Sequence, residues 1–169
     1  TPNSTFSDPG FVKVDDRTIR NANDKTYGTI AMTTALEESV NTAMVWAMQR
    51  TGKDVFAQYV RDFGFGMLSG VQMKSEVAGD IDSLDRYGEV FAATASFGQG
   101  ITTTPLQLAM AYAAIANGGT LMVPQIVDEM RYADGTVDTM LPKPVRRVID
   151  AKTAVTLSGM LVSAVENGH

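Results

Sequence analysis

One stretch, TPLQLAMAYAAIANGG, which begins at Thr104, constrains the fold of this chain more than any other. Thr104 and Gln107 have the spacing of a capping box, and Pro105 stands at the first helical position, where its missing N–H is no loss. The residues that follow are apolar nearly all round, until Gly118-Gly119 ends the pattern. The stretch therefore predicts a helix that other parts of the protein bury.

Apolar residues recur at helical spacing elsewhere, so helices dominate the predicted structure. The predicted helices cover about 29–38, 41–50, 53–63, 88–95, 105–117 and 151–166, with Thr29 and Asp150 as the expected caps of the first and the last. Short strands are predicted at 11–14 and 17–20, which form a hairpin, and at 120–123, 127–132 and 137–140. Residues 66–86 are predicted to be irregular. This pattern, without a long central strand, indicates a helix-dominated α+β fold.

The composition fits a globular protein and excludes several classes of function. Of the 169 residues, 44% are apolar and 20% are charged, which suits one domain or a large piece of one. The net charge of −5 argues against a nucleic-acid surface. Cysteine is absent and the only histidine, His169, is the last residue, so a Cys- or His-based metal site and a Ser-His-Asp triad are not expected. No apolar run reaches the about 18 residues of a membrane span.

The stretch LEESVNTAM contains the strongest candidate for chemistry. Ser39 and Asn41 stand one residue apart at the junction of two predicted helices. A serine hydroxyl can relay a proton, an asparagine amide offers both a donor and an acceptor, and a helix break aims both groups outward from a fixed scaffold. The alternative is structural, because serine and asparagine are also favoured helix caps. The spacing alone leaves both interpretations open.

Other candidate stretches carry weaker signals. The glycines of SFGQG, residues 96–100, allow a ligand to approach the backbone closely, but such a stretch is more typical of a tight link between helices, and it lacks the Lys-Ser/Thr of a phosphate loop. Lys152-Thr153-Ala154 follows the expected cap of a helix, so we do not interpret it as an active-site Lys-Thr-Gly strand. Asp80, Asp82 and Asp85 lack the spacing of a calcium loop. No cofactor and no metal site is therefore expected.

Several segments, in order along nearly the whole chain, resemble the transpeptidase domain of penicillin-binding proteins, especially the class B, monofunctional type. TIRNANDKTYGTIAMTTALEESVNTAMVWAMQRTG resembles the family's passage through its second active-site motif, Ser-x-Asn. ATASFGQGITTTPLQLAMAYAAIANGG resembles the stretch between the second and third motifs, and PKPVRRVIDAKTAVTLSGMLVSAVENGH resembles the approach to the third. The resemblance makes Ser39 and Asn41 the serine and asparagine of the second motif.

The family uses three motifs, Ser-x-x-Lys, Ser-x-Asn and Lys-Thr-Gly, and only the second is present here. No serine is followed by lysine three residues later, and no Lys-Ser/Thr-Gly occurs. The chain begins with Thr1 rather than Met and ends just past a helical pattern. We therefore expect residues 1–169 to form a single partial domain, the central part of a transpeptidase domain, with most of the central sheet missing.

The resemblance implies a serine D,D-transpeptidase that cross-links peptidoglycan stem peptides ending in D-Ala-D-Ala and that β-lactams acylate. Ser39 would belong to the proton relay between the two missing lysines, and Asn41 would hydrogen-bond the substrate amide and one of those lysines. The implied location is the extracytoplasmic face of the bacterial plasma membrane, reached only through missing parts of the parent protein. Because the nucleophile is missing, the chain alone is expected to be inactive.

Two other hypotheses compete with this one. The same fold can serve a β-lactam-sensing or non-catalytic interaction module, which a signalling domain outside this chain would reveal. An unrelated helical adaptor would require the ordered matches to be coincidence. If the central sheet is missing, the fragment exposes apolar faces, which predicts an oligomer or a complementing chain.

Overall fold

The computed structural model describes residues 1–168, so His169 lies outside the described residues. The helices are α1 (Met32–Glu37), α2 (Asn41–Thr51), α3 (Lys53–Asp62), α4 (Val90–Ala95), α5 (Pro105–Ala116) and α6 (Ala151–Asn167), with short 3₁₀ turns η1 (Ala22–Asp24) and η2 (Asp82–Asp85). The strands are β1 (Thr5–Asp8), β2 (Phe11–Val14), β3 (Arg17–Arg20), β4 (Gly28–Ala31), β5 (Thr120–Met122), β6 (Glu129–Arg131), β7 (Val137–Thr139) and β8 (Pro144–Arg147). The predicted helix-dominated α+β class is confirmed.

Within residues 1–168, the strands form only two-stranded antiparallel sheets, which pair β1 with β4, β2 with β3, β5 with β8 and β6 with β7. The predicted hairpin β2–β3 is confirmed, with Phe11 opposite Arg20. The helix predicted to begin at Thr29 is wrong at its start, because Thr29 lies in β4 opposite Ser7, and α1 begins at Met32. The strand β4 is held extended by β1, a partner distant in sequence that local periodicity does not reveal.

The helix ends follow the local signals in the sequence. The capping box of α5 is confirmed, since Gln107 N–H donates to Thr104 Oγ1 at 3.1 Å and Thr104 N–H donates to Gln107 Oε1 at 3.0 Å. The cap of α6 is confirmed too, with Thr153 N–H donating to Asp150 Oδ1 at 2.7 Å. Between α2 and α3, Gly52 has a φ of 90°, which glycine adopts without strain and which ends α2.

The prediction that α5 is buried is wrong for one of its faces. Met110, Ala111 and Ala114 are buried, whereas Leu108 and Tyr112 are about half exposed. The helix packs against α6 and β5, and nothing among residues 1–168 covers its other side. An apolar helix therefore carries one uncovered face.

The core is divided into separate clusters rather than one layer. The largest lies between α2 and α4 and includes Val45, Met48, Ala92 and Ala93. A second lies under α1 and the start of α2, where the rings of Phe6 and Trp46 stand 5.4 Å apart. A third lies beneath α5. The junction between α1 and α2 therefore rests on buried side chains of both strands and helices.

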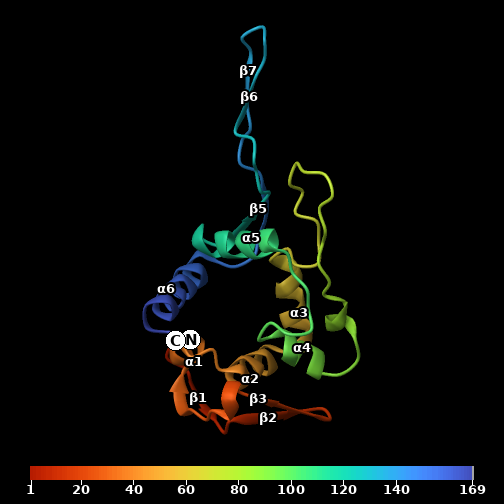
Figure 1. Ribbon diagram of the computed structural model, residues 1–169. Helices are drawn as coiled ribbons and strands as arrows, with labels where there is room; N and C mark the ends of the chain where they lie inside the picture. Colours follow the sequence, from red (N-terminus) through yellow and green to blue (C-terminus); the bar gives the residue numbers. More distant parts are fainter. Residues whose placement is uncertain (169) are drawn as a thin grey trace.

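Figure 1 shows how these parts are arranged. The helix α6 runs back to α1, so the two ends of the chain lie side by side, and the β6–β7 hairpin projects from the opposite end of the molecule. The α1–α2 junction is thus far from the projecting hairpin and close to the chain ends.

Every helix within residues 1–168 is too short or too polar to cross a membrane.

Candidate active-site corner

The backbone around Ser39 turns sharply at the end of α1. Val40 N–H donates to Ala35 O at 2.9 Å and Ser39 N–H donates to Leu36 O at 3.2 Å, which is the pair of hydrogen bonds of a Schellman motif. This turn places Ser39 at a φ of 52°, in the left-handed region where glycine is the usual residue. A non-glycine residue in that region costs about 1 kcal/mol. The exposed Ser39 hydroxyl makes no hydrogen bond within residues 1–168.

Asn41 is the first residue of α2, and its side chain does not cap the helix. The cap position belongs to Val40, so neither the Ser39 nor the Asn41 side chain caps a helix end, and the cap interpretation is wrong for both. Instead, Asn41 Nδ2 donates to Arg20 O at the end of β3, at 3.0 Å. The Asn41 side chain is therefore held by another segment of the chain through its Nδ2 group.

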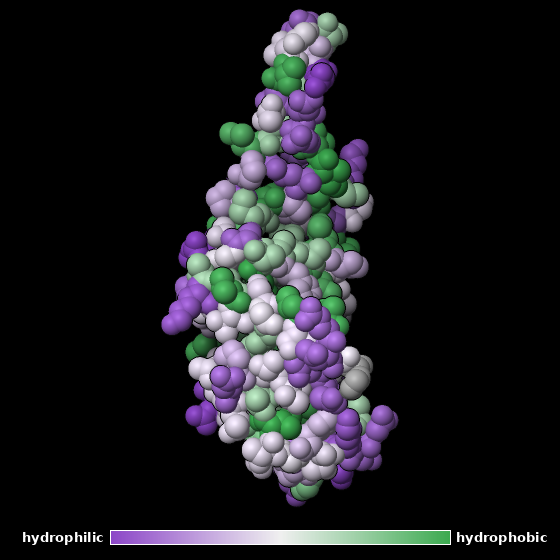
Figure 2. All heavy atoms as spheres, turned by 90° about the vertical axis from the view of Figure 1, so that its left-hand side faces the viewer, coloured by the Kyte–Doolittle hydropathy of each residue, from purple (hydrophilic) through white to green (hydrophobic). Residues whose placement is uncertain are grey.

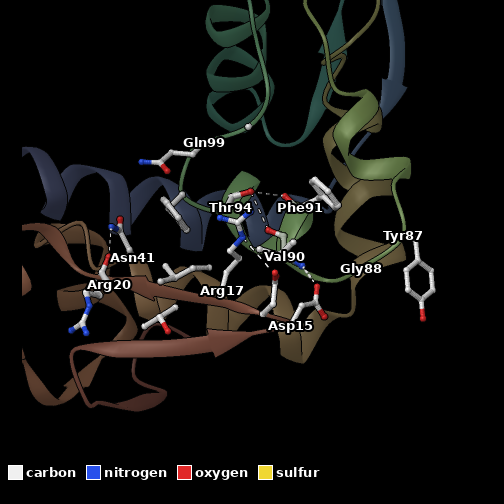
Figure 3. A pocket seen from close by; sticks show the side chains of 15 residues that line it. Asp15, Arg17, Arg20, Asn41, Tyr87, Gly88, Val90, Phe91, Thr94 and Gln99 are labelled. Atoms are coloured by element: carbon white, nitrogen blue, oxygen red, sulfur yellow. Dashed lines mark hydrogen bonds and ion pairs between the residues drawn. The ribbon is translucent and has the colours of Figure 1, made fainter.

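Asn41 lies at the edge of a hollow of about 830 Å³ (Figure 3). One wall is the β2–β3 hairpin, and the other is α4 with the loop that follows it. The lining residues are Asp15, Asp16, Arg17, Thr18, Ile19, Arg20, Asn41, Tyr87, Gly88, Val90, Phe91, Thr94, Phe97, Gln99 and Gly100. The hollow therefore joins two stretches that the sequence singled out, the Ser39–Asn41 junction and SFGQG.

The structure brings only some of the sequence candidates together. Asn41 and Gln99 both line the hollow, whereas Ser39 is not among the lining residues. Between Ser39 and Asn41, Val40 is 0% exposed and packs in the core. Asn41 therefore borders the hollow, whereas the exposed Ser39 lies outside its lining.

A carboxylate from the hairpin turn holds the two walls of the hollow together. Asp15 Oδ2 accepts hydrogen bonds from Glu89 N–H at 2.8 Å and from Val90 N–H at 2.9 Å, at the start of α4. Gly88 allows this approach, because it has a φ of 101° and a Cβ there would lie 3.0 Å from Asp15 Oδ2. Asp15 lies between the two strands of the predicted hairpin, at 11–14 and 17–20, but the sequence pattern did not indicate this contact. The pair of acidic residues at that turn was the available signal.

The charged groups of the hollow come from the same hairpin. Arg17 extends toward α4 (Figure 3) and makes an ion pair with Asp16 at 3.7 Å. Both side chains of that pair are largely exposed, at 73% and 84%, so the pair contributes little stability and leaves the guanidinium able to meet a ligand. Sequence reasoning missed Arg17 as a lining residue as well.

The hollow can hold a polar ligand, but it lacks the parts of a nucleophilic centre. The amides of Asn41 and Gln99 suit a peptide group, and the Arg17 guanidinium suits a carboxylate. The Thr94 hydroxyl donates to helix carbonyls, and no lysine lines the hollow. Within residues 1–168, no group of three possible metal ligands occurs.

Comparison with known proteins places the whole chain in one family. Residues 1–169 match the model of the penicillin-binding protein transpeptidase domain. The chain belongs to this family. The resemblance to class B members is confirmed, because the relatives of this chain include class B proteins.

Individual relatives support the assignment. Stage V sporulation protein D of Bacillus subtilis is 33% identical over 165 residues, which cover 96% of this chain and 26% of that protein. Penicillin-binding protein PbpB of Mycobacterium tuberculosis is 30% identical over 167 residues, covering 98% of this chain and 24% of that protein. The chain thus spans about a quarter of the length of these relatives.

Solved structures agree with this family assignment. The crystal structure of penicillin-binding protein 3 from Mycobacterium tuberculosis has a TM-score of 0.89 at 30% identity, covering 98% of this chain and 37% of that one. That protein has also been solved in complex with aztreonam and with ampicillin. A peptidoglycan synthetase from Bifidobacterium adolescentis has a TM-score of 0.91 at 26% identity, covering 99% of this chain and 31% of that one.

Proposed function

We propose that this chain is the central part of a class B transpeptidase domain and supplies the Ser-x-Asn corner of its active site. In the intact domain, the nucleophilic serine of the first motif attacks the D-Ala-D-Ala carbonyl of a stem peptide and releases the terminal D-alanine. An amine of a neighbouring strand then takes up the acyl group, or a β-lactam traps the serine. Ser39 takes part in the proton relay between the lysines of the other two motifs, and Asn41 binds the substrate amide and one of those lysines.

The observation that carries this proposal is the strained, exposed Ser39 beside a tethered Asn41. Ser39 occupies a left-handed position that glycine would fill at lower cost, and its hydroxyl makes no hydrogen bond within residues 1–168. Backbone strain of this kind concentrates at functional sites. The position of Asn41 at the edge of the hollow supports a binding role for its amide.

The same geometry supports an inactive fragment. A serine hydroxyl is a weak nucleophile without a positioned base, and no lysine lines the hollow beside Asn41. The sequence holds neither a Ser-x-x-Lys nor a Lys-Ser/Thr-Gly. Catalysis therefore needs both flanking motifs, from the parent chain or from a complementing one.

The surface of the chain supports a partial domain. Figure 2 faces the side on which α6 lies, and hydrophobic side chains are scattered over it among polar ones. Val155, Val162 and Val165 of α6 are 72%, 55% and 86% exposed. These three valines stand seven and three residues apart and so share one face of α6, which the central sheet would cover in a parent protein that acts on peptidoglycan outside the plasma membrane.

Labelling with a fluorescent penicillin tests the proposal. This chain alone should show no covalent band on a denaturing gel, and the chain extended to include both flanking motifs should show one. In the extended protein, replacing the first-motif serine by alanine should abolish the band, and Asn41→Ala should weaken it at least about tenfold. A band on residues 1–169 alone, or full labelling of the Asn41→Ala protein, contradicts the proposal.

A further inference from the structure

A buried carboxylate, that of Asp8, lies near the Ser39–Asn41 junction and does not line the hollow. Asp8, at the end of β1, is only 3% exposed. Its Oδ1 accepts hydrogen bonds from Gly10 N–H at 2.8 Å and from the Thr42 hydroxyl at 2.7 Å. Its Oδ2 accepts from Asn21 Nδ2 at 2.8 Å and from Tyr27 N–H at 2.9 Å. Both carboxylate oxygens are therefore satisfied by neutral donors from four separate positions of the chain.

The charge of Asp8 is retained although it is buried. Within residues 1–168, Asp8 takes part in no ion pair. Burial raises the pKa of Asp8, but the Thr42 hydroxyl and the other three donors outweigh burial and hold that pKa below its ordinary 3.8. The carboxylate is thus ionised at neutral pH and lies near the positively polarised N-terminus of α2.

Two of the residues that bind Asp8 are sequence neighbours of the two residues in the hydrogen bond between Asn41 and Arg20. Asn41 Nδ2 donates to Arg20 O, and the residues that follow these two are Thr42 and Asn21. Thr42 N–H donates to Asn21 Oδ1 at 3.1 Å, so the two flanking residues also bond to each other. Asp8 binds both of them through their side chains. One carboxylate therefore clamps the start of α2 to the end of β3, with the Asn41 amide held between them.

We propose that Asp8 is a positioning residue, which fixes the orientation of the Asn41 amide by clamping Thr42 and Asn21. The inference rests on the proposed function for its consequence in catalysis, but the clamp itself can be tested without it. A site group must be held within about 0.5 Å of its productive position, and shifts of about 1 Å can lower a rate by 10²-fold. Loosening the clamp should therefore free the Asn41 amide and slow acylation, while the hollow keeps all of its lining residues.

Thr42 offers a matched pair of variants for the test. Thr42→Val has the same shape but lacks the hydroxyl that donates to Asp8, whereas Thr42→Ser keeps that hydroxyl. Asp8→Asn is the second probe, since it keeps the size of the side chain and removes its charge. Gln107→Ala serves as the structural control, because Gln107 is a buried hydrogen-bonding side chain that contacts none of these residues.

The first measurement follows the Asn41 side-chain amide in this chain, labelled with ¹⁵N-asparagine, by NMR. In Thr42→Val and Asp8→Asn, hydrogen exchange of that amide should accelerate at least about fivefold, because its bond to Arg20 O loosens. Thr42→Ser and Gln107→Ala should remain within about twofold of the parent chain. An Asn41 signal that is unchanged in both Thr42→Val and Asp8→Asn overturns the positioning role.

The second measurement is the rate of penicillin acylation in the protein that carries both flanking motifs. The rate should fall about tenfold or more in Thr42→Val and Asp8→Asn, and Thr42→Ser should restore it. If Asn41→Ala slows acylation but Thr42→Val does not, the positioning inference fails while the proposed function stands. If Asn41→Ala leaves acylation unchanged, the proposed function fails instead, and the NMR result alone decides whether the clamp holds Asn41.

Discussion

We call Asp8, its partners Gly10, Asn21, Tyr27 and Thr42, and the Ser39–Asn41 junction the corner. The corner and the β6–β7 hairpin both contain short antiparallel strands, but different kinds of contact stabilise them. In the corner, strands of four residues are tied to α2 by a buried carboxylate with contacts from across the first 42 residues. In the hairpin, strands of three residues pair only with each other, and every residue of both strands is exposed. The structure of the corner therefore depends on residues that are far apart in the sequence, whereas the hairpin depends only on its own two strands and their turn.

This difference indicates where the molecule can tolerate change. The corner fixes the Asn41 amide through a small number of buried hydrogen bonds, so the loss of one partner leaves others unsatisfied. The hairpin carries its hydrophobic side chains, such as Met130 and Val137, at 39% and 49% exposure, where substitution alters little burial. Substitutions in the two regions should therefore differ in their effect on stability, and only those in the corner should reach the candidate site.

The largest effect is expected for Asp8→Ala. This change removes the acceptor of four hydrogen bonds and leaves the buried N–H of Gly10 and the partly buried N–H of Tyr27 without their partner, which should lower the free energy of unfolding by about 3 kcal/mol. Urea denaturation at pH 7 measures the change. Asp134→Ala in the hairpin is the matched control, because Asp134 also accepts a backbone N–H, from Thr136, but at an exposed turn. Equal losses for the two variants would contradict the comparison.

A somewhat smaller effect is expected for Gln107→Ala, which tests whether a buried hydrogen-bonding side chain outside the corner also contributes to the free energy of unfolding. Gln107 is 1% exposed, and its Nε2 donates to Met67 O and Ala78 O, both at 2.7 Å. Leaving these carbonyls unpaired should cost about 2 kcal/mol in the same denaturation experiment. Asn117→Ala is the control, since Asn117 makes two hydrogen bonds with Thr120 on the exposed surface. Acylation and the Asn41 amide signal should stay unchanged in both variants.

The pH dependence of stability should report on the Asp8 carboxylate directly. Its pKa in the folded protein is lowered below 3.8, so its contribution to stability is present above that pH and is lost as the pH falls through the lower folded value. Between pH 5 and pH 2, the native chain should therefore lose more stability than Asp8→Asn, which has no group to protonate at this position. Other carboxylates titrate in both proteins and cancel in the difference. Parallel stability profiles would argue against an ionised Asp8.

Ser39→Gly should separate stability from function at the corner. Glycine adopts the left-handed backbone at this position without strain, so the free energy of unfolding should rise by about 0.5–1 kcal/mol. In the protein with both flanking motifs, the loss of the hydroxyl should lower the acylation rate at least about tenfold. Ser75→Gly is the control, because Ser75 has a similar φ of 66° in an exposed loop and should gain stability without any effect on acylation. An active Ser39→Gly protein would remove Ser39 from the proton relay.

The elements that could be predicted are those whose signals lie within a few residues. The capping box of α5 and the Asp150 cap of α6 involve residues three apart, and the β2–β3 hairpin closes through a two-residue turn. The pairing of β1 with β4 joins residues at least 20 positions apart, for example Thr5 with Ala31, and no local pattern reveals it. That is why the local pattern predicts Thr29 as a helix cap although it lies in a strand.

The residues of the candidate site also fall into those that the sequence indicates and those that only the folded chain brings together. Ser39 and Asn41 could be assigned from the order of family-like segments, and their catalytic roles stay predictions. The clamp at Asp8 could not be predicted, because its donors come from residues 10, 21, 27 and 42, which only the folded chain brings together. Arg17 was missed because an exposed charged residue in a hairpin is usual and carries no sequence signal of its own.

The smallest effect is expected for the most drastic change, removal of the outer β6–β7 hairpin. Met140 N–H donates to Asp128 O at 2.8 Å, so these residues are paired neighbours that a two-residue Asn-Gly turn in place of residues 129–139 can join. All residues of the two removed strands are exposed and pair with each other, so the free energy of unfolding should change by less than about 0.5 kcal/mol. Urea denaturation and the Asn41 amide signal measure the outcome. A larger loss, or a shifted Asn41 signal, would show that the hairpin is coupled to the corner and would break the comparison.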